Sequence, residues 1–199
     1  MKRKIFLTLA AIVFSTALFA QSTTVHVKGG MQYPSDPDKA GFDSAVTFNF
    51  GLDKYFTGGF ETGFGWMKWK TKDGDWSIDD PRGKLVEKTN IYSLPLLAVA
   101  TVRLGDMMET YGFMPYITGG AGYSWTWFRH PELKTKFHGF TWQAVGGVEI
   151  RFGADSELAF VIEAGYRGAA LENADKWELD MSGFIARVGV SVPIVSDSF

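Results

Sequence analysis

The sequence predicts an all-β fold: an eight-stranded antiparallel up-and-down transmembrane β-barrel, preceded by a signal peptide. Three observations predict it. An export signal occupies the start of the chain, eight later segments alternate apolar and polar residues, and the connections between those segments alternate in length. A barrel that crosses a membrane with strands shows this combination.

The first twenty residues have the layout of a secretory signal peptide. Residues 2–4 are positively charged, residues 5–14 are apolar, and small residues follow as far as Ala20. The apolar run is short for a membrane-spanning helix, which needs about 20 residues. We therefore expect residues 1–20 to be a signal peptide cleaved after Ala20, and residues 21–199 to be one outer-membrane β-barrel domain.

Composition narrows the class of protein. Removing the three basic residues of the signal peptide leaves 17 basic against 22 acidic residues, a net charge of −5, which argues against nucleic acid as a partner. The chain has no Cys, so it forms no disulfide. It has 23 glycines and 16% aromatic residues, and its mature part has no apolar run long enough for a helical span.

The clearest strand covers residues 140–152. One alternate set of its residues is wholly apolar, with Phe140 and Phe152 at its ends, and the other set carries Glu149 and Arg151. Side chains alternate between the two faces of a strand. Aromatic residues at both ends of an apolar face are typical of a strand that faces lipid and reaches both membrane interfaces. The charged face then points into the barrel.

The same alternation recurs in seven further segments. The eight predicted strands are residues 24–33, 44–53, 55–70, 90–104, 113–128, 140–152, 158–167 and 183–195. An even number of antiparallel strands is what a closed barrel with both ends on one side needs. The segment 90–104 is the least regular, because Ile91, Leu97 and Val99 share its polar face.

The connections between predicted strands also alternate. The connections after the second, fourth and sixth strands are short: Lys54, residues 105–112 and residues 153–157. The connections after the first, third, fifth and seventh strands are mostly longer: residues 34–43, 71–89, 129–139 and 168–182. Outer-membrane barrels have short periplasmic turns and longer outside loops, so we expect the long connections outside the cell.

Two of the predicted strands carry a recognisable motif. The motif consists of three runs: Tyr-Ser-Leu-Pro-Leu-Leu over residues 92–97, Thr-Val-Arg over residues 101–103, and Met-Pro-Tyr-Ile-Thr-Gly-Gly-Ala-Gly-Tyr over residues 114–123. Together they resemble the small outer-membrane β-barrel family, the OmpA/OmpX/OmpW-like proteins. The resemblance implies an eight-stranded barrel in the bacterial outer membrane, inserted by the outer-membrane assembly machinery. The chain departs from that pattern at its end, where the alternation breaks before Phe199 and Pro193 lies late in the last strand.

The predicted interior collects charged residues of both signs. An eight-stranded barrel is just wide enough to be filled by side chains, and buried charges need partners. We therefore expect a lumen charge network, acting as a packed plug or as a gate, with Glu149, Glu163 and Arg187 at its core. The predicted members are Lys28, Glu61, Arg103, Glu149, Arg151, Glu163, Arg167 and Arg187.

The apolar faces end in aromatic residues, which we expect at the two membrane interfaces. The predicted interface aromatics are Tyr33, Phe56, Trp66, Tyr92, Phe113, Trp125, Trp127, Phe140, Trp142, Phe152, Tyr166 and Phe184.

The sequence favours a non-enzymatic protein with a structural or loop-mediated role at the cell surface, touching outer-membrane lipid and lipopolysaccharide. Neither His130 nor His138, near the predicted outer edge, has a Ser two residues away, as a hydrolase would want. No metal or cofactor motif is present, and the sequence does not identify a surface partner. Three alternatives remain: a narrow channel for small or hydrophobic solutes, a secreted lipocalin-like ligand binder, and a lipid A-modifying enzyme.

Overall fold

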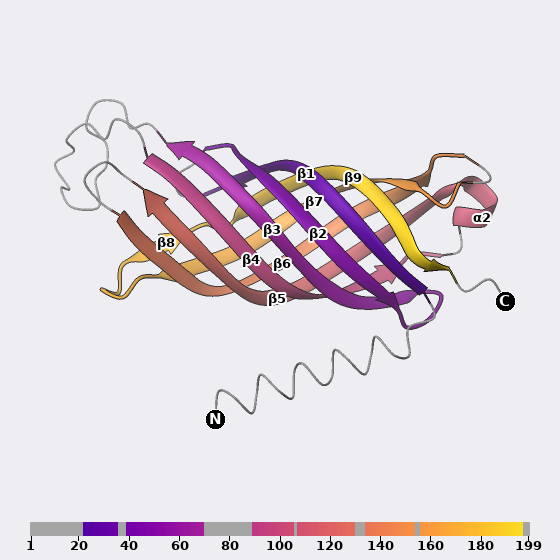
Figure 1. Cartoon of the computed structure of the whole chain (residues 1–199), viewed down its shortest axis with the longest axis horizontal. Helices are drawn as coiled ribbons and strands as arrows, with labels where there is room; N and C mark the ends of the chain where they lie inside the picture. The colour runs from indigo at the N-terminus through magenta and orange to yellow at the C-terminus, as the bar shows by residue number, and fades with distance from the viewer. Residues whose placement is uncertain are drawn as a thin grey trace, which may run out of the picture.

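The computed structural model describes residues 22–35, 39–69, 89–105, 107–129, 134–153 and 156–196. These residues form a closed antiparallel barrel of eight long, tilted strands (Figure 1). The predicted fold class is confirmed. The predicted signal peptide and the terminal Phe199 lie outside the described residues. No helix in the described ranges is long and apolar enough to cross a membrane.

Eight strands form the barrel wall, and a ninth short strand extends it. The barrel strands are β1 (Ser22–Pro34), β2 (Gly41–Gly51), β3 (Phe56–Trp69), β4 (Thr89–Arg103), β5 (Phe113–Arg129), β6 (Lys134–Arg151), β7 (Ala159–Glu172) and β9 (Gly183–Ser196). The short strand β8 (Glu178–Asp180) pairs with the end of β7. Each barrel strand pairs with its neighbours in sequence, and β9 closes the circle by pairing with β1.

The pairing register fixes the tilt of the strands. Following paired residues from Met31 through β2 to β5 leads to Lys136 on β6. Following them from Met31 the other way, through β9 and β7, leads to Gly146 on β6. The barrel therefore closes with a stagger of ten residues along β6. Such a stagger over eight strands requires the strands to tilt by roughly 35–45° from the barrel axis.

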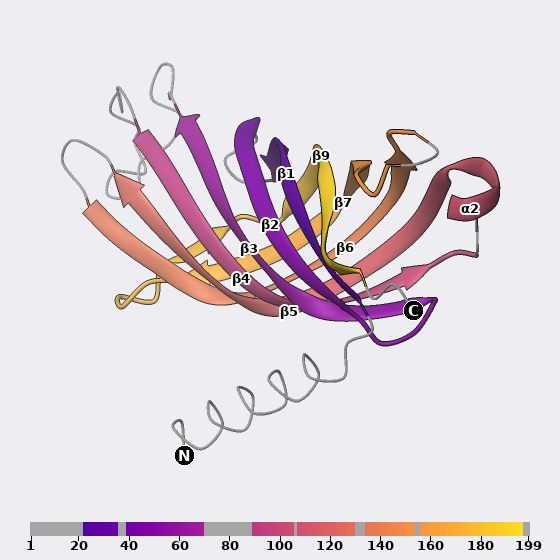
Figure 2. The same ribbon diagram turned by 45° about the vertical axis from the view of Figure 1, so that its right-hand side comes forward.

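Short turns gather at one end of the barrel, called the turn end here. The β2–β3 turn covers residues 52–55 rather than Lys54 alone, and the Asp53 carboxylate accepts the backbone N–H groups of Tyr55 and Phe56 at 2.6 and 2.8 Å. The eight-residue connection predicted between β4 and β5 contains a single helical turn, α2 (Met108–Tyr111), which ends at Gly112 with a φ of 73°. Figure 1 labels α2 and β8 at opposite ends of the barrel, and Figure 2 shows α2 from a second side.

The other end of the barrel, called the loop end here, departs from the prediction. Residues 129–139 are not a long loop, because β5 and β6 stay paired as far as Arg129 and Lys134, and only residues 130–133 connect them. Residues 168–182 are partly strand as well, since β7 continues to Glu172 and pairs with β8. The barrel wall therefore extends well beyond the predicted strands at this end.

Two prolines interrupt the wall without breaking it. Pro95 lies in the middle of β4, and the β3–β4 pairing is interrupted between Thr62↔Leu96 and Gly65↔Ser93 without a change of register. Pro193 sits at a shift in the β1–β9 register, where Thr23 pairs with Val195 and Thr24 with Pro193. Proline lacks the N–H that a ladder needs and is tolerated at such bulges. The late Pro193 therefore marks a bulge in a strand that continues to Ser196.

Adjacent glycines on β6 serve opposite faces. A Cβ on Gly147 would lie 2.5 Å from the Tyr116 ring, which crosses over this position inside the barrel. A Cβ on Gly146 would have no atom within 4 Å, because Gly146 faces outward. Only Gly147 is needed to admit an interior side chain.

We predict that Gly147→Val lowers the free energy of unfolding by about 1–3 kcal/mol, the usual cost of overpacking a filled interior. Gly146→Val is the matched control and should leave stability close to the wild-type value. Urea unfolding in lipid vesicles, followed by Trp fluorescence, measures both. Equal effects at the two positions would contradict the crowded interior.

Candidate functional site

The centre of the lumen is organised around the carboxylate of Glu61, which is 1% exposed. Gln143 and Arg187 donate hydrogen bonds to its Oε1 atom at 2.8 and 2.9 Å. Lys28 and Thr47 donate to its Oε2 atom, both at 2.8 Å. A carboxylate has about four acceptor positions, so Glu61 is fully satisfied without water.

Two cations join Glu61 to a second acidic residue across the lumen. Lys28 on β1 contacts both Glu61 on β3, at 2.8 Å, and Glu163 on β7, at 3.0 Å. Arg187 on β9 contacts the same two carboxylates at 2.9 and 2.6 Å. Tyr116 on β5 also donates a hydrogen bond to Glu163 at 2.9 Å. Apart from Arg187 and Glu163, which face each other on the paired strands β9 and β7, these contacts span strands that are not neighbours, so they cross the interior.

A third acidic residue of the layer lies nearer the loop end. Asp43 on β2 is fully buried and accepts a hydrogen bond from Arg167 on β7 at 2.9 Å. Arg187 also approaches Asp43, at 3.5 Å. The three acidic and three basic residues balance in charge. We call them the charge layer: Lys28, Asp43, Glu61, Glu163, Arg167 and Arg187.

The structure separates the other predicted members from this layer. Glu149, expected at the core, lies nearer the turn end and contacts His26 at 3.4 Å instead. Arg103 and Arg151 are half-buried at the turn end and form no ion pair with another described residue. The expectation that Glu149 stands at the centre of the network was wrong, because it is Glu61 that Lys28 and Arg187 share with Glu163.

Sequence reasoning missed Asp43, because it fell inside a predicted loop. It also did not assign Gln143, Thr47 and Tyr116 to the network, although all three lie on faces predicted to point inward. A strand boundary set two residues earlier would have put Asp43 on the inward face of β2. These three side chains are neutral hydrogen-bond donors on inward faces, and that property could have identified them as partners of the predicted interior charges.

Apolar side chains fill the lumen at the loop end. Phe128 and Phe137 meet edge to face with ring centroids 6.4 Å apart. We call the whole group the apolar cap: Met67, Ile91, Phe128, Phe137, Ala169, Leu171, Leu179 and Met181. Its members come from β3 to β8 and from Met181 just after β8, so it fills the interior next to these strands on the loop-end side of the charge layer.

The outward face is apolar over the middle of the barrel, and all twelve predicted interface aromatics lie on it. Phe56, Phe113 and Phe152 are exposed at the turn end, whereas Trp66 and Trp125 are exposed towards the loop end. Phe56 and Trp66 are ten residues apart on β3. At about 3.3 Å per residue and a tilt of roughly 40°, they are separated by about 25 Å along the axis, the height of the apolar band of an outer-membrane barrel.

Metal binding has no support in the described part of the chain, where no group of three or more His, Asp or Glu side chains is placed to hold an ion. Neither of the two described histidines belongs to such a group. His26 contacts Glu149 and Asn49 inside the barrel, and the outward-facing His138 stacks on Tyr123, whose hydroxyl lies 2.7 Å from its Nδ1 atom.

Comparisons agree with this geometry. The sequence profile of the family described as outer membrane protein beta-barrel domain matches residues 6–191. The structure of Neisserial surface protein A has the same fold, with a TM-score of 0.58, 9% identity, and coverage of 86% of this chain and 95% of that one. The N-terminal β-barrel domain of Pseudomonas aeruginosa OprF gives a TM-score of 0.49 at 14% identity, covering 88% and 98% of the two chains. No curated protein is similar enough in sequence to be counted as a relative.

We predict that Glu61→Gln destabilises the barrel by about 3–5 kcal/mol, because Lys28 and Arg187 would each lose a buried counter-charge. Glu157→Gln, which removes the same charge from an exposed residue, is the control and should cost much less. Urea unfolding in lipid vesicles compares the two. A Glu61→Gln variant as stable as the control would show that the charge layer does not hold the barrel together.

Proposed function

Because the chain belongs to the outer membrane protein β-barrel family, we propose that its barrel is a sealed, non-enzymatic anchor in the bacterial outer membrane that presents outside loops for interaction at the cell surface. The turn end then faces the periplasm and the loop end faces outside, as in other barrels of this kind. Export by the N-terminal signal peptide and insertion by the outer-membrane assembly machinery belong to the same proposal.

The filled lumen is the observation that carries the proposal. Salt bridges of the charge layer cross the interior at the middle of the barrel, and the apolar cap fills the interior at the loop end. An ion passing through would have to separate fully buried charge pairs and then cross an apolar segment. Both steps are costly, which supports a plug rather than the narrow channel.

The polarity of the two faces argues against a secreted ligand binder. A lipocalin-like protein would need an apolar ligand cavity and a polar exterior. Here the interior holds Glu61, Glu163 and Arg187, whereas large apolar side chains such as Phe48 and Ile117 are exposed on the outside. Lipid is the solvent that suits such an exterior.

The histidines give no support for hydrolysis. His26 is 5% exposed inside the barrel, and its contacts are to Glu149 and Asn49 rather than to a hydroxyl. His138 contacts a Tyr hydroxyl on the outer face. Neither His is paired with a Ser nucleophile of the kind that acyl transfer uses; His130 lies outside the described residues.

We predict that the purified full chain produces no unitary current steps in planar lipid bilayers, because the lumen is closed at two levels. A large porin inserted into the same bilayers confirms that the assay detects insertion and conduction. Steady current steps that change in size with Glu163→Gln would contradict the sealed lumen and favour a channel gated by the charge layer.

A further inference from the structure

Four basic side chains lie close together on the outward face of the loop end. Lys68 on β3, Arg129 on β5 and Lys134 and Lys136 on β6 are all exposed. Three of them follow one line of paired residues across four strands, in which Lys68 pairs with Asn90, Asn90 with Arg129, and Arg129 with Lys134. We call these four residues the basic row.

The basic row lies directly beyond the aromatic residues of the loop-end interface. The ammonium group of Lys68 lies 4.9 Å from the centre of the Trp66 ring, and the guanidinium of Arg129 lies 5.7 Å from the centre of the Tyr92 ring. Lys136 pairs with Trp127 in the register. Each cation is therefore placed at the outer edge of the apolar band, where the polar headgroups of the outer leaflet begin.

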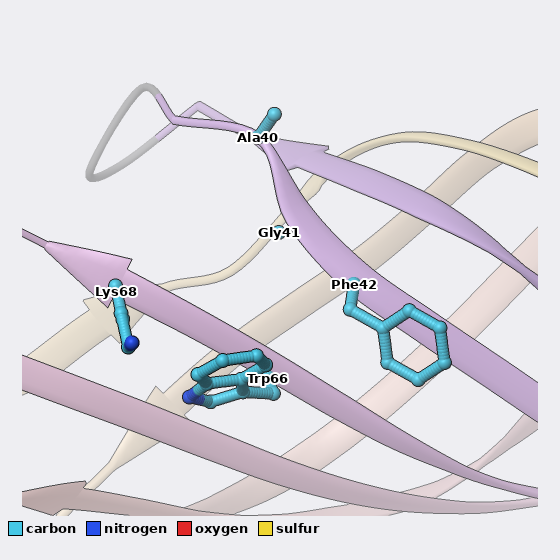
Figure 3. A pocket seen from close by; sticks show the side chains of 5 residues that line it. All are labelled: Ala40, Gly41, Phe42, Trp66 and Lys68. Atoms are coloured by element: carbon cyan, nitrogen blue, oxygen red, sulfur yellow. The ribbon is translucent and has the colours of Figure 1, made fainter.

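A hollow on the outer surface adjoins this row. It has a volume of about 280 Å³ and is lined by Ala40, Gly41, Phe42, Trp66 and Lys68. Figure 3 shows the rings of Phe42 and Trp66 on adjacent strands, with the Lys68 side chain beside Trp66. Its walls are mostly apolar and its one charged group is a cation, which suits a ligand with an anionic group joined to an apolar part.

Within strands β2 to β6, no described acidic side chain lies on the outward face that carries the basic row. The described acidic residues within β2 to β6 whose side chains are placed, Asp43, Glu61 and Glu149, all point inward. Exposed acidic side chains begin on the next strand, where Glu172 on β7 pairs with His138 on β6, and continue with Glu178 and Asp180 on β8. Among the described residues, the outward face of β3 to β6 at the loop end therefore carries positive charge, which attracts anions.

We propose that the basic row binds the phosphate groups of a phosphorylated outer-leaflet glycolipid, with the hollow between Phe42 and Trp66 receiving an adjoining part of the same lipid. Charge complementarity selects phosphate, since Lys and Arg are its usual ligands. The position at the edge of the apolar band selects a lipid over a soluble anion. The proposal rests on the proposed function only in placing the loop end in the outer leaflet.

The test titrates bisphosphorylated lipid A into the detergent-solubilised full chain and follows Trp fluorescence. We expect saturable binding that weakens about tenfold in the double variant Lys134→Gln/Lys136→Gln, since surface lysines each add to the affinity for anionic lipid. The control Lys54→Gln/Lys176→Gln removes the same charge from exposed residues elsewhere and should bind like the wild type. Unfolding in urea confirms that both variants fold.

Two further ligands separate the sources of the phosphate. Dephosphorylated lipid A should bind weakly, and inorganic pyrophosphate should compete only at much higher concentration than lipid A. The proposed site would be wrong if both double variants lost the same amount of affinity for lipid A. It would also be wrong if dephosphorylated lipid A bound as tightly as bisphosphorylated lipid A. If pyrophosphate competed as strongly as lipid A, the proposal of a lipid ligand would be wrong, and the basic row would be a site for a soluble anion. Because none of these readouts measures conductance, failure here is distinguishable from failure of the sealed-lumen proposal.

Discussion

The structure depends on one constraint: an eight-stranded barrel is too narrow for water to solvate the charges inside it. Each interior charge must therefore be satisfied by other interior groups. Glu61 meets this requirement with four donors, and the charge layer as a whole holds as many acidic as basic residues. Most of the pairs, such as Glu61 on β3 with Arg187 on β9, join strands that are not neighbours, so those pairs form only when the barrel has closed.

The same strands reverse their polarity along their length. Within the apolar band, β5 points Ile117 and Trp125 outward and Thr118 inward, as lipid requires. Beyond the band it points Arg129 outward and Phe128 inward, as a water-soluble protein would. The apolar cap and the basic row are the inner and outer sides of this second pattern. The pattern of the wall thus changes from one suited to lipid to one suited to water at the loop-end aromatic residues, while the strands themselves continue without a break.

This reversal explains what the sequence could and could not predict. The alternation of apolar and polar residues predicts all eight barrel strands and shows which face of each strand points into the barrel. It can do so because the outward face must be apolar across the whole membrane. Residues 134–139 have no apolar outward face, because Lys136 points outward and Phe137 inward, so their sequence predicts a loop where the structure has a paired strand. The same reversal accounts for the apolar Ile91 on the polar face of β4, since it belongs to the cap.

Charged positions could be predicted to lie inside, but not which charges pair. Pairing depends on the stagger of the closed barrel, which brings Glu61 on β3 within reach of Arg187 on β9. Alternation within single strands holds no information on that stagger. The central member of the network and the role of Asp43 therefore emerged only from the three-dimensional arrangement.

The coupling free energy between Glu163 and Arg187, which face each other across β7 and β9, tests the account most directly. A double-mutant cycle of Glu163→Gln and Arg187→Met, with urea unfolding in lipid vesicles, measures it. The account predicts that the double variant loses less stability than the sum of the losses in the two single variants. The difference, which is the coupling free energy, should lie near the upper end of the range of about 0.5–3 kcal/mol found for contacting residues. Additive losses would contradict the claim that paired interior charges hold the barrel.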